Sequence, residues 1–342
     1  MADINVDAFL APVNDTAPCG EDLEYDPAFQ VLEEAARGKA EQQFGDTVIA
    51  AQEPDWRAMQ EQSLALLQRT RDLRVAIHLL RASTRLNGFG GFASGIKLVR
   101  GLLEKYWDHV YPQLDASDNN DPTMRLNALA PLADPSGLLA DRDNVLADLR
   151  QAVIGHARDG MTVRQIELGL GKAEPASGES APSEAGVTEA LSAASGQFPE
   201  LFGQIAGAHA DVRGIEAVIS AKAGAGIGPE LRQLRMLTQH LAQAAAALQG
   251  ASADTTEGGA TEAGATPSVR GLGSGAINSR DDAIKALDRV CEWIGRNEPT
   301  NPAPLLIRRA QRLMGKSFLE IIRDLAPDGL KDVERIAGVD SE

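Results

Sequence analysis

Two segments of this chain contain no Val, Ile, Leu, Met or aromatic residue, and they restrict where a folded core can form. They span residues 172–186 and 250–268. Neither segment can bury enough apolar surface to offset the backbone entropy that is lost on folding. Both are therefore predicted to lie in flexible linkers that separate the folded parts of the chain.

These linkers predict three folded parts. We expect an N-terminal helical domain at 1–171, a linker at 172–186, a middle helical region at 187–249, a second linker at 250–278 and a C-terminal unit at 279–342. Ten of the fourteen aromatic residues belong to the first part. Because aromatic side chains bury large areas, the N-terminal domain is expected to hold the largest core.

Apolar residues recur at intervals of three and four along most of the chain, which is the pattern of amphipathic helices. One such stripe occupies 90–110, and two occupy 54–86. Asn87 and Gly88 separate these segments and are typical of a helix end, because both residues tolerate a left-handed backbone. The nearest strand candidate, 47–49, is too short to carry a sheet, so the predicted fold class is all-α.

Several side chains of the N-terminal domain are predicted to have structural roles. The expected core residues are Trp56, Leu73, Trp107 and Tyr111. Four aspartates are expected to cap helices or to pair with Arg57, Arg71 and Arg74, and the alternative for them is contact with a partner protein. These aspartates are Asp22, Asp26, Asp55 and Asp72. His78 lies between Ile77 and Leu79 and is interpreted as a partly buried structural residue.

The middle and C-terminal parts have thin predicted cores. The middle region is rich in Ala and Gly, so it is expected to pack against neighbouring parts of the chain or against other copies of itself. The C-terminal unit is predicted to contain three helices, around 284–294, 305–314 and 318–325. The residues proposed for its apolar core and its subunit contacts are Leu305, Leu306, Leu313, Met314, Phe318, Ile321, Ile322 and Leu325.

Charge is distributed unevenly along the chain. Residues 279–342 hold 11 basic and 12 acidic residues, so the first 278 residues carry −15 of the total formal charge of −16. This acidic balance argues against a nucleic acid or an anionic membrane surface as the main partner. A basic cluster in the C-terminal unit comprises Arg308, Arg309, Arg312, Lys316 and Arg323. It is interpreted either as a solvated helix face or as an electrostatic contact with an acidic surface of a partner or neighbouring subunit.

No motif for catalysis, metal binding or cofactor binding is found in the sequence. No two of the five histidines have the spacing of a helical metal pair, and no Gly-x-Ser-x-Gly elbow occurs. The glycine-rich segment 88–91 follows no predicted strand, so it is not interpreted as a phosphate-binding loop. We therefore expect that the chain is not an enzyme and that it binds no cofactor. An enzyme with scattered carboxylates is the competing hypothesis, and it would need a large polar pocket within 1–171.

The sequence also predicts a cytoplasmic location. No stretch approaches the roughly 20 apolar residues that cross a bilayer, so direct membrane insertion is not expected. The N-terminal residues lack the charged and apolar regions of a secretory signal. The two cysteines, Cys19 and Cys291, are far apart and are expected to be reduced thiols.

Four separated motifs, in order, resemble the ImpA N-terminal domain, which marks the TssA proteins of bacterial type VI secretion systems. They are PCGEDLEYDPAF at 18–29, EPDWRAM at 53–59, RDLRVAIHLLRAS at 71–83 and GLLEKYWDHVYPQLD at 101–115. A further segment, 298–330, resembles the C-terminal end of the shorter, ImpA-like members of this family.

This resemblance implies a structural component of the contractile injection machine. The short ImpA-like branch is associated with the baseplate and with priming or coordinating the assembly of the tail tube and sheath. The resemblance also implies a ring-like homo-oligomer that forms through 279–342. The expected partners are other copies of the chain and the baseplate, tail tube and sheath proteins. The alternative is a monomeric or dimeric chaperone-like adaptor for a secretion-system component, which the oligomeric state would distinguish.

Overall fold

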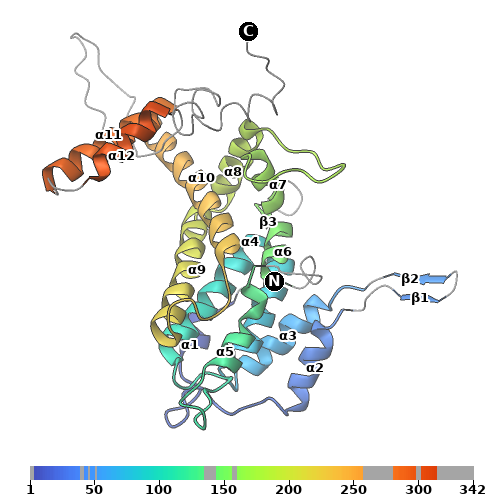
Figure 1. The fold of residues 1–342 in the computed structure, drawn as a ribbon. Coiled ribbons are helices and arrows are strands. Elements are labelled where there is room, and N and C mark those ends of the chain that lie inside the picture. Colours follow the sequence, from blue (N-terminus) through green and yellow to red (C-terminus); the bar gives the residue numbers. More distant parts are fainter. Residues whose placement is uncertain are drawn as a thin grey trace. The chain divides into compact units, whose positions relative to one another are not determined.

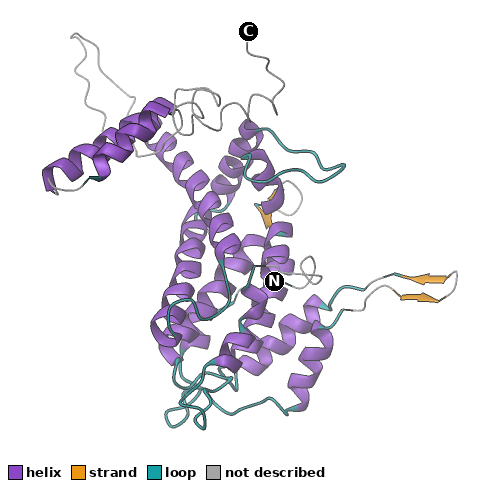
Figure 2. Ribbon diagram, viewed as in Figure 1, coloured by secondary structure: helices purple, strands orange, loops and turns teal. Residues whose placement is uncertain are grey.

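A computed structural model gives the structure of the chain, and the residues that it describes are mostly helical (Figures 1 and 2). The described ranges are 4–38, 42–44, 47–50, 52–134, 144–155, 160–256, 280–297 and 302–313. The prediction of a predominantly helical fold is confirmed. The chain divides into two compact units, Met1–Ala260 and Thr261–Glu342, and each is described by itself.

The first unit is built around α4 (Leu73–Tyr106), which consists of two helical parts separated by the non-helical residue Gly88. The carboxylate of Asp72 caps its first turn by accepting a hydrogen bond from the N–H of Arg74. The first helical part ends before Gly88, whose φ of 63° lies in the left-handed region. A Cβ atom at Gly88 would lie 2.6 Å from the carbonyl oxygen of Val153, so both the conformation and the space require glycine. The helix end predicted at this position is confirmed, because Gly88 breaks the helical conformation and the two helical parts of α4 then pack side by side. A Cβ atom at Gly95 would lie only 2.8 Å from the Cα atom of Leu80.

Three helices of the N-terminal segment surround α4. They are α1 (Val6–Leu10), α2 (Pro27–Ala36) and α3 (Trp56–Leu67). α1 and α3 pack against α4, and α2 packs against α3. Between α2 and α3, strands β1 (Gln42–Phe44) and β2 (Thr47–Ile49) form an antiparallel pair. β2 is the segment 47–49 that the sequence predicted to be too short to carry a sheet, and it pairs only with β1, which the sequence analysis did not predict.

A second group of short elements follows α4. It comprises α5 (Thr123–Ala128), η1 (Ala130–Leu132), α6 (Val145–Gln151), β3 (Val153–Ile154), β4 (Met161–Thr162) and α7 (Val163–Gly169). The two strands pair in antiparallel fashion, and both α6 and β3 contact α4. Thr162 and Gln165 form a reciprocal capping box at the start of α7.

The predicted linker at 172–186 has no helix or strand over residues 172–183, but side chains hold it to α7. The guanidinium of Arg164 pairs with the carboxylate of Glu179 at 2.8 Å and donates to the carbonyl oxygen of Glu174. The carboxylate of Glu179 also accepts a hydrogen bond from the N–H of Ala176. The segment therefore has defined contacts with the folded unit, which apolar composition alone did not predict.

The middle helices share the core of the first unit. They are α8 (Glu184–Gln197), α9 (Leu201–Ala223) and α10 (Arg232–Thr256). α9 packs along α4, and α10 packs along α9. The division into domains at 1–171 and 187–249 differs from this arrangement, because these Ala-rich helices bury their few large apolar residues against α4 and against one another. α10 also extends beyond residue 249, where the second linker was predicted to begin.

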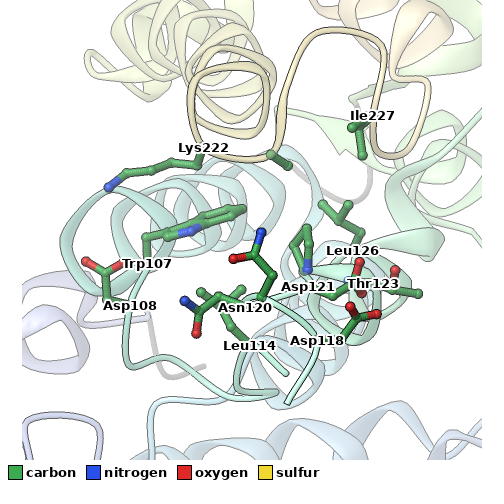
Figure 3. A pocket seen from close by; sticks show the side chains of 13 residues that line it. Trp107, Asp108, Leu114, Asp118, Asn120, Asp121, Thr123, Leu126, Lys222 and Ile227 are labelled. Atoms are coloured by element: carbon green, nitrogen blue, oxygen red, sulfur yellow. The ribbon is translucent and has the colours of Figure 1, made fainter. Parts of the chain in front are cut away.

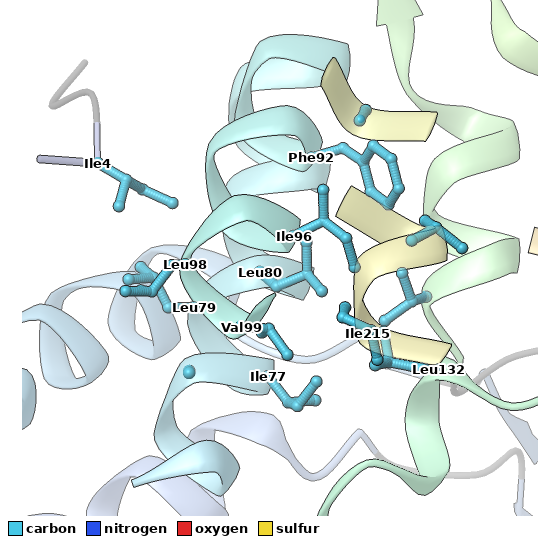
Figure 4. Packing of buried hydrophobic residues seen from close by; sticks show 14 of the residues in the cluster. Ile4, Ile77, Leu79, Leu80, Phe92, Ile96, Leu98, Val99, Leu132 and Ile215 are labelled. Atoms are coloured by element: carbon cyan, nitrogen blue, oxygen red, sulfur yellow. The ribbon is translucent and has the colours of Figure 1, made fainter. Parts of the chain in front are cut away.

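Figure 4 shows how residues from distant segments meet in this core. Leu80 and Ile96 of α4 and Ile215 of α9 are completely buried in one cluster. Each such side chain contributes about 1.5–3 kcal/mol to stability through burial. Of the residues predicted for the core, Leu73, Trp107 and Tyr111 are buried, and Trp56 is partly buried against the cluster.

The second unit contains a helical hairpin of α11 (Arg280–Asn297) and α12 (Ala303–Leu313). The side-chain amide of Gln311 donates to the carbonyl oxygen of Ile284 at 3.0 Å and to the carboxylate of Asp288 at 2.9 Å. Near the turn, the buried thiol of Cys291 lies 3.9 Å from the carbonyl oxygen of Pro304. These contacts show that the two helices run antiparallel. They correspond to the first two predicted helices, and the third, 318–325, lies outside the described residues.

None of the helices in the described part of the chain combines the length and apolar character that are needed to cross a lipid bilayer.

Candidate interaction surfaces

The side of α12 that faces away from α11 carries exposed leucines. Leu305 is 72% exposed and Leu306 is 69% exposed. Because successive residues of a helix are rotated by about 100°, these leucines lie opposite Ile307 and Gln311, which are partly buried on the α11 side. Arg309 lies on the same exposed side as the leucines. We call the surface formed by Leu305, Leu306 and Arg309 the α12 face.

The α12 face contains part of the predicted oligomerisation set. Leu305 and Leu306 are exposed rather than packed in the hairpin, and Arg308 and Arg309 of the basic cluster are exposed as well. Arg312 and Leu313, which also belong to the predicted sets, are the last two residues of α12. The other predicted residues lie outside the described part of the chain, and these are Met314, Lys316, Phe318, Ile321, Ile322, Arg323 and Leu325.

The predicted helix caps in the N-terminal unit are confirmed for three aspartates. Asp26 accepts a hydrogen bond from the N–H of Ala28, and Asp55 accepts one from the N–H of Ala58. Asp72 caps α4, as described above. Asp26 also pairs with Arg69 at 2.7 Å, and the hydrogen bond from Arg69 lowers the pKa of Asp26 below its ordinary value.

Arg74 connects two of the motifs that carried the family resemblance. Its guanidinium pairs with Asp72 at 2.8 Å, with Glu24 at 2.9 Å and with Asp22 at 3.8 Å. It also lies over the ring of Phe29, 4.8 Å from the centroid. The segment 18–29 is thereby fixed to the start of α4, and the predicted pairing of Asp22 and Asp72 with an arginine is confirmed.

Two buried arginines bind carbonyl groups. The guanidinium of Arg71, which was predicted to pair with an aspartate, donates to the carbonyl oxygens of Leu67 and, at 2.8 Å, Ala11. Arg125 is completely buried and donates to the carbonyl oxygens of Trp107, Val110 and Pro112. Burial lowers the pKa of Arg125 to about 10. Both arginines thus satisfy carbonyl groups at or near helix ends, where the backbone lacks its own donors.

His78 has the structural role that the sequence predicted. It is partly buried, and its Nε2 atom lies 3.2 Å from a carboxylate oxygen of Glu33 on α2. The hydrogen bond from His78 lowers the pKa of Glu33 below its ordinary value. The contact joins α2 to α4.

A cavity of about 650 Å³ opens beside the C-terminal end of α4, and we call it the α4 cavity. Figure 3 shows Lys222 and Ile227 approaching from the segment at the end of α9, and Asp118, Asn120 and Asp121 from the loop before α5. The walls also include Trp107, Asp108, Leu114, Asn119, Pro122, Thr123, Leu126 and Ala223. The lining therefore combines three carboxyl groups, one ammonium group and several apolar side chains.

The loop before α5 has a defined backbone that orients the polar wall. Asn119 and Asn120 have φ values of 50° and 59°, a left-handed conformation that asparagine adopts more readily than most residues. The carboxylate of Asp121 accepts a hydrogen bond from the N–H of Thr123 at 2.8 Å. Hydrogen bonds from Thr123 lower the pKa of Asp121, so this carboxylate is ionised at neutral pH.

The α4 cavity could not be found from motif spacing. Its walls come from residues 107–126 and 222–227, two segments that are far apart in the sequence. The only local signal is the run of Asp and Asn before Pro122, which is typical of a turn. None of the lining residues is His, Cys or Ser, and the described parts of the chain hold no group of three His, Cys, Asp or Glu side chains that could share a metal ion.

The described fold is that of a mainly helical protein with two compact units, and comparisons with known proteins give its family. Residues 10–134 match the sequence profile described as "ImpA, N-terminal, type VI secretion system". The type VI secretion system component TssA1 of Pseudomonas aeruginosa is 35% identical over 351 residues, which cover 99% of this chain and 100% of that protein. The chain therefore belongs to the TssA (ImpA) family of type VI secretion system components, as the four motifs predicted.

A solved structure was also matched, that of the N-terminal domain of TssA from Burkholderia cenocepacia, which includes the conserved ImpA N-terminal region. It has 21% sequence identity to this chain and a TM-score of 0.49. The match covers 73% of this chain and 96% of the solved chain.

Proposed function

We propose that this protein is a non-enzymatic assembly component of a bacterial type VI secretion system that acts in the cytoplasm as a ring-like homo-oligomer. Its role would be at the baseplate, in priming or coordinating the assembly of the tail tube and sheath. Membership of the TssA family supports the secretion-system role. The resemblance of 298–330 to the shorter, ImpA-like members supports the placement at the baseplate.

The proposal of an oligomer rests on one observation, which is the exposure of Leu305 and Leu306 on the α12 face. Neighbouring exposed leucines on one helix are unfavourable in water, and a second protein surface can remove them from solvent. A two-helix hairpin has a high ratio of surface to core, so association of several copies is an effective way to bury its apolar side chains. We propose that the C-terminal unit, residues 279–342, forms the contacts between subunits.

The first unit would then provide the contacts with other proteins of the machine. Several such units attached to one oligomer would raise the local concentration of binding surfaces, so individually weak contacts could hold an assembly together. The proposed partners are baseplate, tail tube and sheath proteins.

The oligomeric state tests this proposal directly. The mass of the full-length protein would be measured by light scattering after size-exclusion chromatography at micromolar concentration. We expect a mass several times the 36.2 kDa of one chain. Ring-shaped particles in electron micrographs would support the proposal further. A monomer or dimer would overturn it and would favour the chaperone-like adaptor.

A double variant separates the α12 face from other exposed apolar residues. Leu305→Asp combined with Leu306→Asp is expected to reduce the mass toward that of one chain, because charged residues cannot be buried between subunits without a partner. Val31→Asp is the matched control, because Val31 is 52% exposed on α2 of the other unit. Its mass should equal that of the unchanged protein. Circular dichroism would verify that all variants retain their helices.

A further inference from the structure

We propose that the α4 cavity binds an arginine or lysine side chain that a partner protein presents. The inference rests on the proposed function in one respect, which is that the first unit contacts other proteins. It adds the chemical group of the partner protein that one such contact would recognise.

The charge of the lining favours a cation. Asp108, Asp118 and Asp121 supply three carboxyl groups, whereas Lys222 supplies one ammonium group. The first 278 residues also carry a formal charge of −15, so the field around the unit attracts basic surfaces.

The apolar part of the lining fits the hydrocarbon stem of a long basic side chain. Leu114, Leu126 and Ile227 line the same space as the carboxyl groups. Lysine and arginine bury their methylene groups against apolar surface while the charged end meets polar groups. A cavity with both kinds of wall therefore matches the whole side chain and not only its charge.

Exposed apolar residues at the cavity point to a protein as the source of that side chain. Ile227, which lines the cavity, is 53% exposed, and Met124, which follows the lining residue Thr123, is 58% exposed. Exposed large apolar residues beside a polar recess are typical of surfaces that bind other proteins. A small free cation would leave both residues in water.

The arrangement of the carboxyl groups disfavours a metal ion as the ligand. Asp121 already accepts a hydrogen bond from the backbone of Thr123, and Asp108 lies in a different segment, just after α4. Across the described residues, no three acidic, imidazole or thiol groups come close enough to share a metal ion. An extended organic cation can contact separated carboxylates, whereas a metal ion needs them to converge.

The fluorescence of Trp107, which lines the cavity, provides a direct measurement. The chain has three tryptophans, so the full-length variant Trp56→Phe with Trp293→Phe leaves Trp107 as the only indole. This protein would be titrated with the peptide acetyl-Leu-Arg-amide and with acetyl-Leu-citrulline-amide, which has nearly the same shape but no charge. We expect a saturable change with the arginine peptide and at least a tenfold weaker response to the citrulline peptide. Equal responses, or none to the arginine peptide, would overturn the proposal.

Two substitutions should shift the affinity in opposite directions. Asp118→Asn removes a negative charge and is expected to weaken binding of the arginine peptide about fivefold, whereas Lys222→Gln removes the opposing positive charge and is expected to strengthen it. Asp15→Asn, which removes an exposed carboxyl group outside the lining, should leave the affinity unchanged. If Asp118→Asn and Asp15→Asn have the same effect, the cavity is not the binding site.

Two further measurements complete the test. A titration of the same protein with calcium chloride should leave the fluorescence of Trp107 unchanged, and a saturable response to calcium without one to the arginine peptide would overturn the proposal in favour of a metal site. The mass of each variant in solution separates this inference from the proposed function. Loss of peptide binding with an intact oligomer would reject only the cavity, whereas a monomer that still binds the peptide would reject only the ring.

Discussion

At the scale of single residues, the first unit satisfies buried carbonyl groups with arginine side chains. Arg125 contacts three carbonyl oxygens in the segment that follows α4, and its guanidinium lies 5.2 Å from the ring centroid of Trp107. Where a helix ends, its last carbonyl groups lack backbone donors, and the N–H groups of one guanidinium can replace several of them. The side chain of Arg125 therefore supports the conformation of the segment 107–112, together with backbone hydrogen bonds such as the one from the N–H of Tyr111 to the carbonyl oxygen of Arg71.

Replacing Arg125 should accordingly destabilise the protein strongly. Arg125→Ala leaves the three carbonyl groups without their donor and creates a space in the core, which together should lower the free energy of unfolding by about 3–5 kcal/mol. Urea denaturation followed by circular dichroism measures this change. Arg57→Ala, at an exposed position on α3, is the control and should change the stability by less than about 0.5 kcal/mol. Equal stability of the two variants would show that Arg125 has no such role.

The pair of Arg164 and Glu179 gives a prediction about pH. The hydrogen bond from Arg164 lowers the pKa of Glu179 from 4.5 to about 2. Because the folded-state pKa lies below the unfolded value, the contribution of Glu179 to stability is present above about pH 4.5 and is lost as the pH falls toward 2. In Arg164→Ala, the pKa of Glu179 measured by NMR should return toward 4.5. An unchanged low value would mean that Arg164 is not its cause.

At the scale of elements, the break at Gly88 joins the two helical parts of α4 at a point where the backbone packs against β3. Gly88 combines a left-handed backbone with close packing against the carbonyl oxygen of Val153. A methyl group added at this position would be strained by the positive φ and would also clash with the carbonyl oxygen of Val153. A shift of Val153 would remove the clash but not the backbone strain. The two halves of α4 thus have a fixed relation that depends on this glycine.

Gly88→Ala is therefore expected to lower the free energy of unfolding by about 1–3 kcal/mol. Gly207→Ala is a matched control, because Gly207 lies within α9 and a Cβ atom there would meet nothing within 4 Å. Alanine at that position should be neutral or should stabilise the protein by about 0.5–1 kcal/mol. Thermal melts of both variants would show the contrast, and a Gly88→Ala protein as stable as Gly207→Ala would contradict the steric argument.

At the scale of the whole molecule, α4 and α9 belong to one core although they come from segments that were predicted to be separate domains. Phe92 and Ile96 of α4 are buried in the same cluster as Ile205 and Ile215 of α9. Removing α9 would therefore expose a continuous apolar surface on α4. The first unit should unfold as one body and not in two steps.

Truncation tests this unity. A chain that ends at residue 256 should retain a single cooperative thermal transition, whereas a chain that ends at residue 171 should lose cooperativity or aggregate, because the surface of α4 that packs against α9 is exposed. Differential scanning calorimetry of the two chains would measure the difference. If the shorter chain melts as cooperatively as the longer one, residues 1–171 form an independent domain after all.

The sequence predicted local features better than distant ones. The caps at Asp26, Asp55 and Asp72 depend on neighbouring residues, so a reading of adjacent positions was sufficient. The carbonyl partners of Arg125 and the walls of the α4 cavity depend on how distant segments pack, which periodicity does not encode. Composition also did not reveal that one ion pair and a few hydrogen bonds attach residues 172–183 to the rest of the first unit.

The α12 face and the α4 cavity belong to different compact units. We therefore expect a substitution in the α4 cavity to change the proposed recognition of a partner protein and to leave the proposed self-association through the α12 face unchanged. Natural variation can therefore adapt one property to a changing neighbour protein while the other is inherited unaltered. If both proposals hold, related chains in different bacteria would be free to change one surface at a time.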